Sequence, residues 1–413
     1  MKRRVVVTGL GMLTAVGNDV ARTWQGLLDA KSGGGPITRF DTTRFDVKFA
    51  CELKGFDVTQ YMERKEAKRS DLYTQYAVAA SVQAMSDAGL GEGTFDPERC
   101  GVIIGSGIGG LRTFEDQCET YFKSGPGRIS PFFIPMFIGD IAAGVVSMRF
   151  QAKGPNYAVQ SACATSSHAI GDAMRTIQYG DADIMIAGGS EAAVGPMAIG
   201  GFANMGALSN RNDSPETASR PFDLTRNGFV LGEGAGIVVL EELEHALARG
   251  VKIYGEVVGY RATGDAYTLT GQPDAHEGLQ RSMRGALMDA GLAPTDVQYV
   301  NAHGTSTPLN DPNESQAIKA VFGEHAYNLS VSSTKSATGH MLGAAGSTEF
   351  IACALAIRDG QIPPTINYQT PDPECDLDYT PNAPRAREVN VAISNSSGFG
   401  GHNVTLALRR YVA

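Results

Sequence analysis

One cysteine has a setting that suits covalent chemistry. Cys163 stands in VQSACATSSHAIGDAM (159–174), where the β-prone run NYAVQSA stops and a helical pattern begins. This spacing predicts a sharp turn with Cys163 at a helix N-terminus, where unpaired backbone N–H groups favour a thiolate and can bind an oxyanion. The helix end supplies roughly 0.3–1 kcal/mol, or ~2 when partly buried, which lowers the thiol pKa by about one unit from ~8.5. A lone cysteine is more often structural, so its role depends on which other reactive residues the sequence offers.

Two histidines and a glycine loop could act together with Cys163. His303 lies in NAHGTSTPLND (301–311) after the run VQYVNA, and His340 lies in SSTKSATGHMLGAAGSTE (332–349) before a helical pattern. Histidines at strand ends among Gly, Ser and Thr are poorly explained by core packing. In NSSGFGGHN (395–403) the glycines lack a Cβ and let the backbone approach a ligand closely. Together with Cys163, these segments favour nucleophilic catalysis.

The elements that must position these residues alternate between strand and helix. Strands are expected at 3–10, 100–106, 182–189, 236–243, 253–260, 297–304, 329–334 and 390–398, and helices at 69–89, 163–179, 278–291 and 343–358. Several strands are nearly continuous in Val and Ile, which predicts an α/β fold with largely parallel, doubly covered sheets. AMSDAGL (84–90) recurs as ALMDAGL (286–292), and VIIGSG parallels YVNAHG, which indicates a duplicated α/β unit.

Composition excludes several classes of protein. The net charge of −9 over 413 residues argues against nucleic acid and anionic membranes as general partners. The six cysteines include no CxxC and no Cys/His cluster at metal-ligand spacing, so we expect neither a disulfide framework nor a zinc site. No apolar run approaches the ~18 residues of a membrane helix. The start, MKRRVVVTGLGM, enters a strand-and-glycine pattern without signal-peptide features, so we expect a cytoplasmic protein.

The motifs ACATSSH, NAHGTSTP, KSATGH and GFGG resemble those of the β-ketoacyl-acyl carrier protein synthases of the elongating type, near synthase II, and the similarity runs essentially end to end. The resemblance implies the thiolase fold, five αβαβα layers from two duplicated halves. These would be 1–250, which carries the nucleophile, and 251–413, which carries both histidines. It also implies a homodimer, acyl carrier protein as the partner, and no metal or redox cofactor, since substrates travel on the phosphopantetheine arm.

The resemblance also implies roles for individual residues. Cys163 would accept the acyl group, with His303 and His340 completing a triad and Lys335 and Glu349 ordering the histidines and loops. Backbone N–H groups of Cys163 and Phe399 would form an oxyanion hole. The substrate-binding positions would be Thr305 and Thr307 for the phosphopantetheine arm, Ile108 and Phe202 for the acyl pocket, and Phe399 as its gate. The reaction would be a decarboxylative Claisen condensation with malonyl-acyl carrier protein, in which neutral imidazoles stabilise the enolate.

Two positions depart from the family pattern. Ser397 occupies the place of a larger residue beside the gate, which leaves chain-length preference and gate mobility open, and Gly206 occupies the place of a basic residue that docks the carrier. The remaining basic positions, Arg64, Lys65, Lys68, Arg69 and Arg128, are expected to dock the acidic carrier protein, more weakly on the Gly206 side. The alternative is an ordinary solvated helix face.

Rival functions fit the sequence less well. GSGIGG (105–110) matches a dinucleotide fingerprint, but no Asp or Glu about 20 residues later follows a strand to bind a ribose. A degradative thiolase would need a second Cys in a C-terminal C-x-G loop, whereas the last Cys is Cys375 in PECDLD. A chain-length-factor-like subunit would lack the active Cys. A ketosynthase of a polyketide or specialised lipid pathway has the same active site and stays open.

Overall fold

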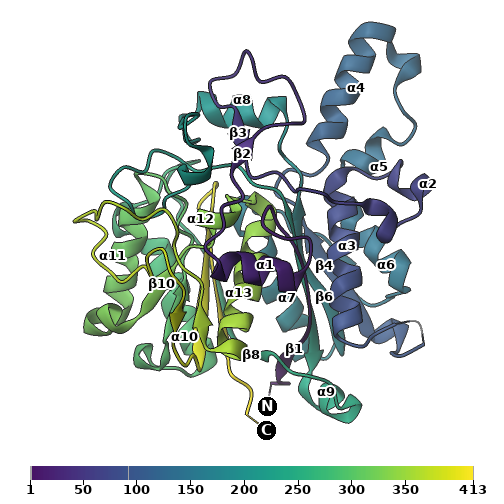
Figure 1. The fold of residues 1–413 in the computed structure, drawn as a ribbon. Coiled ribbons are helices and arrows are strands. Elements are labelled where there is room, and N and C mark those ends of the chain that lie inside the picture. The colour runs from purple at the N-terminus through teal and green to yellow at the C-terminus, as the bar shows by residue number, and fades with distance from the viewer. Residues whose placement is uncertain (1, 92, 413) are drawn as a thin grey trace.

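Ten strands form a sheet that is built twice from one pattern (Figure 1). The computed structural model describes residues 2–91 and 93–412. The strands are β1 (Val5–Leu13), β4 (Cys100–Gly105), β5 (Asn156–Tyr157), β6 (Ile184–Glu191), β7 (Gly234–Glu242), β8 (Gly255–Gly264), β9 (Tyr299–Asn301), β10 (Ser330–Ser332), β13 (Val391–Gly398) and β14 (His402–Arg409). The spatial order is β1-β7-β6-β4-β5 in the first half and β8-β14-β13-β9-β10 in the second. In chain order these are the same topology, which confirms the duplication.

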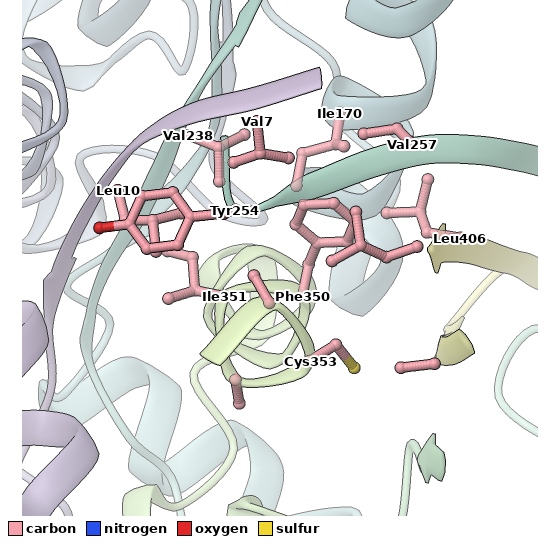
Figure 2. Close-up of a cluster of buried hydrophobic side chains, with 14 of the residues drawn as sticks. Val7, Leu10, Ile170, Val238, Tyr254, Val257, Phe350, Ile351, Cys353 and Leu406 are labelled. Atoms are coloured by element: carbon pink, nitrogen blue, oxygen red, sulfur yellow. The ribbon is translucent and has the colours of Figure 1, made fainter. Parts of the chain in front are cut away.

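The two half-sheets meet at β1 and β8, which pair through Val6–Glu256 and Val7–Gly255. Two helices, α7 (Thr165–Tyr179) and α13 (Ala345–Asp359), lie between the half-sheets. Figure 2 shows Phe350 and Ile351 of α13 among Val7, Val238 and other apolar side chains. Every residue of α13 from 345 to 357 is buried, as expected of a helix covered on all sides.

Outer helices cover the remaining faces of both half-sheets. On the first half, α3 (Leu72–Asp87) packs on β1, β6 and β7, and α6 (Ile141–Phe150) packs on β4. On the second, α10 (Glu277–Ala290) packs on β8 and β14 beside α11 (Asn310–Phe322). The layers are therefore αβαβα, and the five-layered thiolase-like fold is confirmed.

The remaining elements are peripheral or short. They are α1 (Val20–Leu28), α2 (Arg64–Ala67), α4 (Leu111–Ser124), α5 (Phe133–Phe137), α8 (Pro196–Asn204), α9 (Leu243–Arg249), α12 (Lys335–Thr338), and the ribbons β2 (Gly35–Pro36) with β3 (Phe49–Ala50) and β11 (Gln361–Ile362) with β12 (Arg385–Ala386). In the described part of the chain, no helix combines the length and apolar composition needed to cross a bilayer.

The expectation of largely parallel sheets is wrong in part. The strands β4, β5 and β6 run parallel, but β7 is antiparallel to both β6 and β1. The second half repeats this, with β14 antiparallel to β13 and β8. The strands β1, β4, β6 and β7 are buried along their whole length whichever way they run. A near-continuous apolar composition therefore indicates burial on both faces and not strand direction.

Candidate active site

Cys163 lies at the predicted junction between an extended segment and a helix. The 3-10 turn Ala162–Ala164 precedes α7, and Ala162 adopts a left-handed φ of 49°. The Ser161 N–H donates to Thr165 Oγ1 at 2.8 Å, which ties the entry of the turn to the first residue of α7. The Cys163 thiol is buried yet faces the cavity described below.

The expectation of a slightly acidic thiol is wrong, because Cys163 is buried. Burial raises the pKa of Cys163 to about 12, although the Lys335 ammonium and the Phe399 N–H favour the thiolate. Desolvation of a thiolate outweighs the modest effect of a helix end. Cys163 therefore rests as a thiol, and its proton must be removed during acyl transfer.

His303 and His340 come from different segments and meet at the same cavity. Their ring centroids are 5.4 Å apart and their planes are nearly perpendicular, at 86°. The His303 and Gly304 N–H groups donate to Glu314 at 2.9 and 2.8 Å, and the His340 N–H donates to the Val230 carbonyl at 2.7 Å. Burial, reinforced by the Lys335 charge, holds the pKa of each histidine well below its usual range. Both imidazoles are neutral.

Lys335 and Glu349 form a buried ion pair behind these rings. Lys335 begins α12 and Glu349 lies on α13, and each side chain is 2% exposed. Burial raises the pKa of Glu349 to about 7, against the opposing effect of the Lys335 ammonium. The pair places one positive group close to Cys163, His303 and His340, whose ionisation it influences.

A cavity of about 300 Å³ joins these residues. The predicted site residues on its wall are Cys163, Phe202, His303, Thr305, Thr307, His340 and Phe399. Ile108 packs in the apolar cluster that contains Cys163, Phe202 and Leu342, but it does not line the cavity. Lys335 and Glu349 likewise stay behind the wall. No group of three or more His, Cys, Asp or Glu side chains within the described residues is arranged to bind a metal ion.

The glycine loop approaches the nucleophile as its composition predicts. A Cβ on Gly398 would lie 2.7 Å from the Ser161 carbonyl oxygen and 3.1 Å from the Cys163 nitrogen, which explains the glycine. Gly400 has a φ of 87° and donates to the Leu269 carbonyl at 2.7 Å. The neighbouring Phe399 N–H donates to the Cys163 sulfur. The oxyanion hole expected of this N–H and that of Cys163 stays a prediction.

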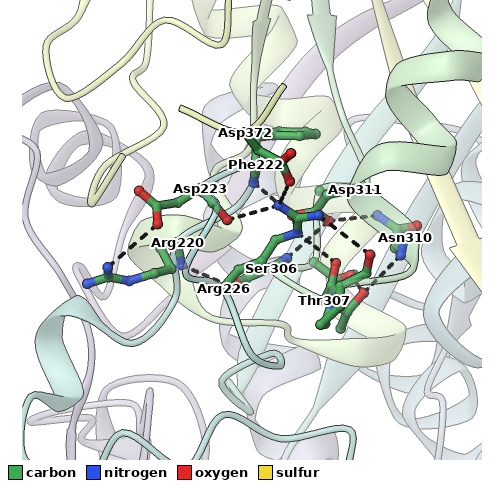
Figure 3. Close-up of polar contacts among 12 residues, drawn as sticks. Arg220, Phe222, Asp223, Arg226, Ser306, Thr307, Asn310, Asp311 and Asp372 are labelled. Carbon is green, nitrogen blue, oxygen red and sulfur yellow. Dashed lines mark hydrogen bonds and ion pairs between the residues drawn. The ribbon is translucent and has the colours of Figure 1, made fainter. Parts of the chain in front are cut away.

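A buried polar network holds the loop that carries Thr305 and Thr307, called the threonine loop below (Figure 3). Thr305 and Thr307 share a hydrogen bond of 2.9 Å between their hydroxyls. Arg226 donates to the Thr307 carbonyl at 3.1 Å and to Asp372 at 2.5 Å. Asp311 accepts the Ser306 N–H at 3.2 Å. Arg226 therefore fixes the backbone that presents both hydroxyls.

Sequence reasoning missed the groups that hold the loops in place. These are Arg226 and Asp372 of the threonine loop, Glu314 beneath His303, and Glu191. Glu191 accepts N–H groups from Gly107 at 2.8 Å and Gly343 at 3.0 Å. The sequence does contain one feature that could have indicated Glu191. It is a lone acidic residue at the end of an apolar run, after IMIAGGS.

The expected docking residues lie together on the surface. Arg64 and Lys65 belong to α2, and all five basic side chains, Arg64, Lys65, Lys68, Arg69 and Arg128, are exposed. The Arg69 guanidinium lies 4.5 Å from the centroid of the Phe132 ring, which brings α2 beside the segment that carries Arg128. Gly206 lines the cavity with a φ of 68° and open space where a Cβ would stand.

The chain is similar to known condensing enzymes along its whole length. The family models "Beta-ketoacyl synthase, N-terminal domain" and "Beta-ketoacyl synthase, C-terminal domain" match residues 2–246 and 254–369. Proteins named 3-oxoacyl-[acyl-carrier-protein] synthase 2 from Synechocystis and Coxiella burnetii are 55% and 52% identical, each over 99% of both chains.

Solved structures agree with the sequence relatives. A type II polyketide ketosynthase, in complex with its acyl carrier protein, has a TM-score of 0.93 at 38% identity over 100% of both chains. A β-ketoacyl synthase from Burkholderia phymatum has a TM-score of 0.92 at 36% identity over the same full coverage. The matched models and the full-length identity together show that this chain belongs to the β-ketoacyl synthase family.

Proposed function

We propose that this chain is an elongating 3-oxoacyl-acyl carrier protein synthase, which condenses malonyl-acyl carrier protein with an acyl group held on Cys163. The observation that carries the proposal is the meeting of Cys163, His303 and His340 on one cavity beside the Phe399 N–H. Relatives at 52–55% identity bear the name of this activity.

In the first step, the Cys163 sulfur attacks the thioester carbonyl of acyl-carrier. The thiol proton passes to a neutral imidazole on the same cavity wall and then to the departing carrier sulfur, so a thioester forms on Cys163 as the carrier thioester breaks. The N–H groups of Cys163 and Phe399 bind the oxyanion of the tetrahedral intermediate. The Lys335 charge favours the thiolate against the burial that raises the pKa of Cys163.

In the second step, malonyl-carrier loses CO2 and its carbanion attacks the acyl-Cys163 carbonyl. The electrons of the broken C–C bond pass into an enolate, whose oxygen accepts N–H bonds from His303 and His340. Each neutral ring keeps one N–H that can donate to this oxygen, and burial keeps both pKa values low. Attack forms the new C–C bond and breaks the C–S bond of the acyl thioester. The Cys163 thiolate that leaves takes up a proton from solvent and returns to the thiol. We propose that no metal or redox cofactor takes part.

The carrier protein would dock on Arg64 and Lys65 of α2, on Lys68 and Arg69 just after it, and on Arg128. Their charge is locally opposite to the net charge of −9, so they could hold an acidic partner that the rest of the surface repels. We expect weaker contact beside Gly206, which offers no side chain there.

We also propose a homodimer and a cytoplasmic location. The strand β5 is the last in its half-sheet, and both of its residues are exposed. Its open edge could pair with the same strand of a second copy and so continue the sheet across a two-fold axis. All six cysteines are free, as is usual in a reducing compartment.

Product analysis tests the proposed reaction. Purified protein with acyl-carrier and malonyl-carrier should release CO2 and form 3-oxoacyl-carrier two carbons longer, for a panel of acyl lengths. Repeated rounds on one carrier, which give poly-β-keto chains, would favour the alternative of a polyketide ketosynthase, to which the solved structures give some weight. Absence of any condensation product would overturn both.

A further inference from the structure

His168 is a half-buried imidazole to which the proposed reaction gives no task. It lies in the first turn of α7 and does not line the cavity. Its Nδ1 atom is 2.8 Å from Ser161 Oγ and 3.2 Å from the Ala164 carbonyl oxygen. Because a carbonyl oxygen can only accept, Nδ1 carries the hydrogen and shares it between these two oxygens. His168 therefore bonds both ends of the turn that holds Cys163.

The turn that His168 bonds is strained and closely packed. Ala162 has a left-handed φ of 49°, which costs free energy and must be held by surrounding contacts. A Cβ on Gly398 would lie 2.7 Å from the Ser161 carbonyl oxygen and 3.1 Å from the Cys163 nitrogen. The Phe399 N–H, next to Gly398, donates to the Cys163 sulfur. A small shift of the turn would therefore move the sulfur relative to both N–H groups that are expected to bind the oxyanion.

The second half of the chain contains the same turn without this bridge. The 3-10 turn Leu342–Ala344 precedes α13 as Ala162–Ala164 precedes α7. Met341 and Thr348 hold the positions that match Ser161 and His168. The Thr348 hydroxyl reaches the carbonyl at the end of its turn at 3.4 Å, but Met341 offers a thioether in place of the serine hydroxyl. The side-chain bridge across the turn thus occurs where the nucleophile is.

We infer that His168 is a positioning residue, which holds the Cys163 sulfur and N–H in the geometry that acyl transfer needs by bonding Ser161 and Ala164. The inference rests on the proposed function. Acyl transfer is sensitive to such positioning, because the sulfur must meet the thioester carbon while the N–H groups point to the oxygen on which charge develops. Since His168 does not line the cavity, its loss should slow the chemical step and leave the binding of acyl-carrier unaltered.

Two reactions of Cys163 separate positioning from general damage to the enzyme. Acylation by acyl-carrier, followed by intact mass against substrate concentration, needs the sulfur and the oxyanion site to be aligned. Alkylation by iodoacetamide needs the thiol but no oxyanion site. His168→Leu should lower kcat for acylation roughly 10- to 50-fold and change KM and the alkylation rate less than about twofold.

Further variants test the bonds themselves. His168→Asn places an amide N–H near the position of Nδ1 and should recover most of the acylation rate. Ser161→Ala removes one of the two acceptors and should lower kcat about three- to tenfold. Combined with His168→Leu it should cause no further loss, because both changes remove the same bond. Thr348→Val, at the matching position of the second turn, is the control and should leave acylation unaltered.

The outcomes distinguish this inference from the proposed function. Equal losses of acylation and alkylation, a loss through KM alone, or an unchanged kcat in His168→Leu would each overturn the inference. So would losses that multiply in the double variant, since the two side chains would then act separately. If His168→Leu does not fold, Ser161→Ala in the same two reactions carries the test. A wild type that no acyl-carrier acylates would instead overturn the proposed function.

Discussion

The two central helices begin with the same backbone turn and carry different chemistry. The helix α7 follows Ala162–Ala164 and α13 follows Leu342–Ala344, and the first residue of each turn has a left-handed φ, 49° at Ala162 and 44° at Leu342. The middle residue is Cys163 in one turn and Gly343 in the other. A Cβ on Gly343 would lie 2.2 Å from the Gly107 nitrogen. Duplication therefore made one turn twice, and only the first has room for a nucleophile.

The two halves also differ at the ends of their equivalent strands, β4 and β9. Buried glutamates hold both, because the Gly107 N–H donates to Glu191 and the Gly304 N–H donates to Glu314, each at 2.8 Å. In the first half Ser106 donates its hydroxyl to Glu191 at 2.9 Å, whereas in the second half the His303 ring faces the cavity. On the proposed assignment, the first half supplies the nucleophile and the second supplies the imidazoles.

The largest expected effect comes from removing an imidazole. His303→Ala should lower the rate of malonyl decarboxylation on the acylated enzyme roughly 100- to 1000-fold, because the enolate loses a hydrogen-bond donor. CO2 release measures this rate, and intact mass reports acylation of Cys163 separately. Ser106→Ala, at the equivalent strand end, should change decarboxylation less than about threefold. Similar losses of decarboxylation rate in both variants would contradict the proposal that only the second half supplies the imidazoles.

A side chain at Gly343 tests the difference between the two turns. Gly343→Ala should lower the free energy of unfolding by roughly 1–3 kcal/mol, because the new Cβ collides with the backbone at Gly107. Cys163→Ala removes an atom from a cavity wall and should cost less. Chemical denaturation compares the two variants, and a Gly343→Ala protein as stable as wild type would contradict the steric account.

Glu191 links the strand end of the first half to the turn at Gly343, and its ionisation should appear in the pH dependence of stability. Burial raises the pKa of Glu191 to about 7, against ~4.3 in an unfolded chain. The folded state then binds this proton more tightly, so the contribution is complete below about pH 4 and is lost as pH rises through about 7. Glu191→Gln should reduce the fall in unfolding free energy between pH 5 and pH 8 by roughly 1–2 kcal/mol. An unchanged pH profile in denaturation experiments would refute this.

The smallest effect is expected outside the duplicated core. Lys65→Glu and Arg69→Glu should raise KM for acyl-carrier about three- to tenfold and leave kcat for acyl-pantetheine unaltered, since only docking changes. Lys31→Glu, an exposed charge reversal on a different segment, is the control. If KM stayed constant for both docking variants, α2 and the residues just after it would be an ordinary solvated surface.

Local patterns were enough to identify the candidate catalytic positions. Cys163, His303 and the GFGG loop each mark the end of a strand or the start of a helix, and such boundaries are visible within about ten residues of sequence. The structure brings the three together at one cavity, as the resemblance implied. Their individual roles stay predictions.

What sequence reasoning missed depends on contacts between distant segments. The thiol pKa was misjudged because a helix end is local, while the burial of Cys163 comes from residues far away in the chain. Glu191 contacts residue 343, and Arg226 contacts residue 372. The sequence around each of these residues gives no indication of its distant partner. The strand β14 was not predicted either, although its burial follows from pairing with β8 and β13.

The account depends most directly on covalent transfer to Cys163, and intact mass after incubation with acyl-carrier tests it. The wild type should gain one acyl group, and so should Cys51→Ala, a control at another buried thiol whose pKa is likewise raised to about 12. Cys163→Ala should gain none. An acyl adduct formed equally by Cys163→Ala would contradict the assignment of this residue as the nucleophile.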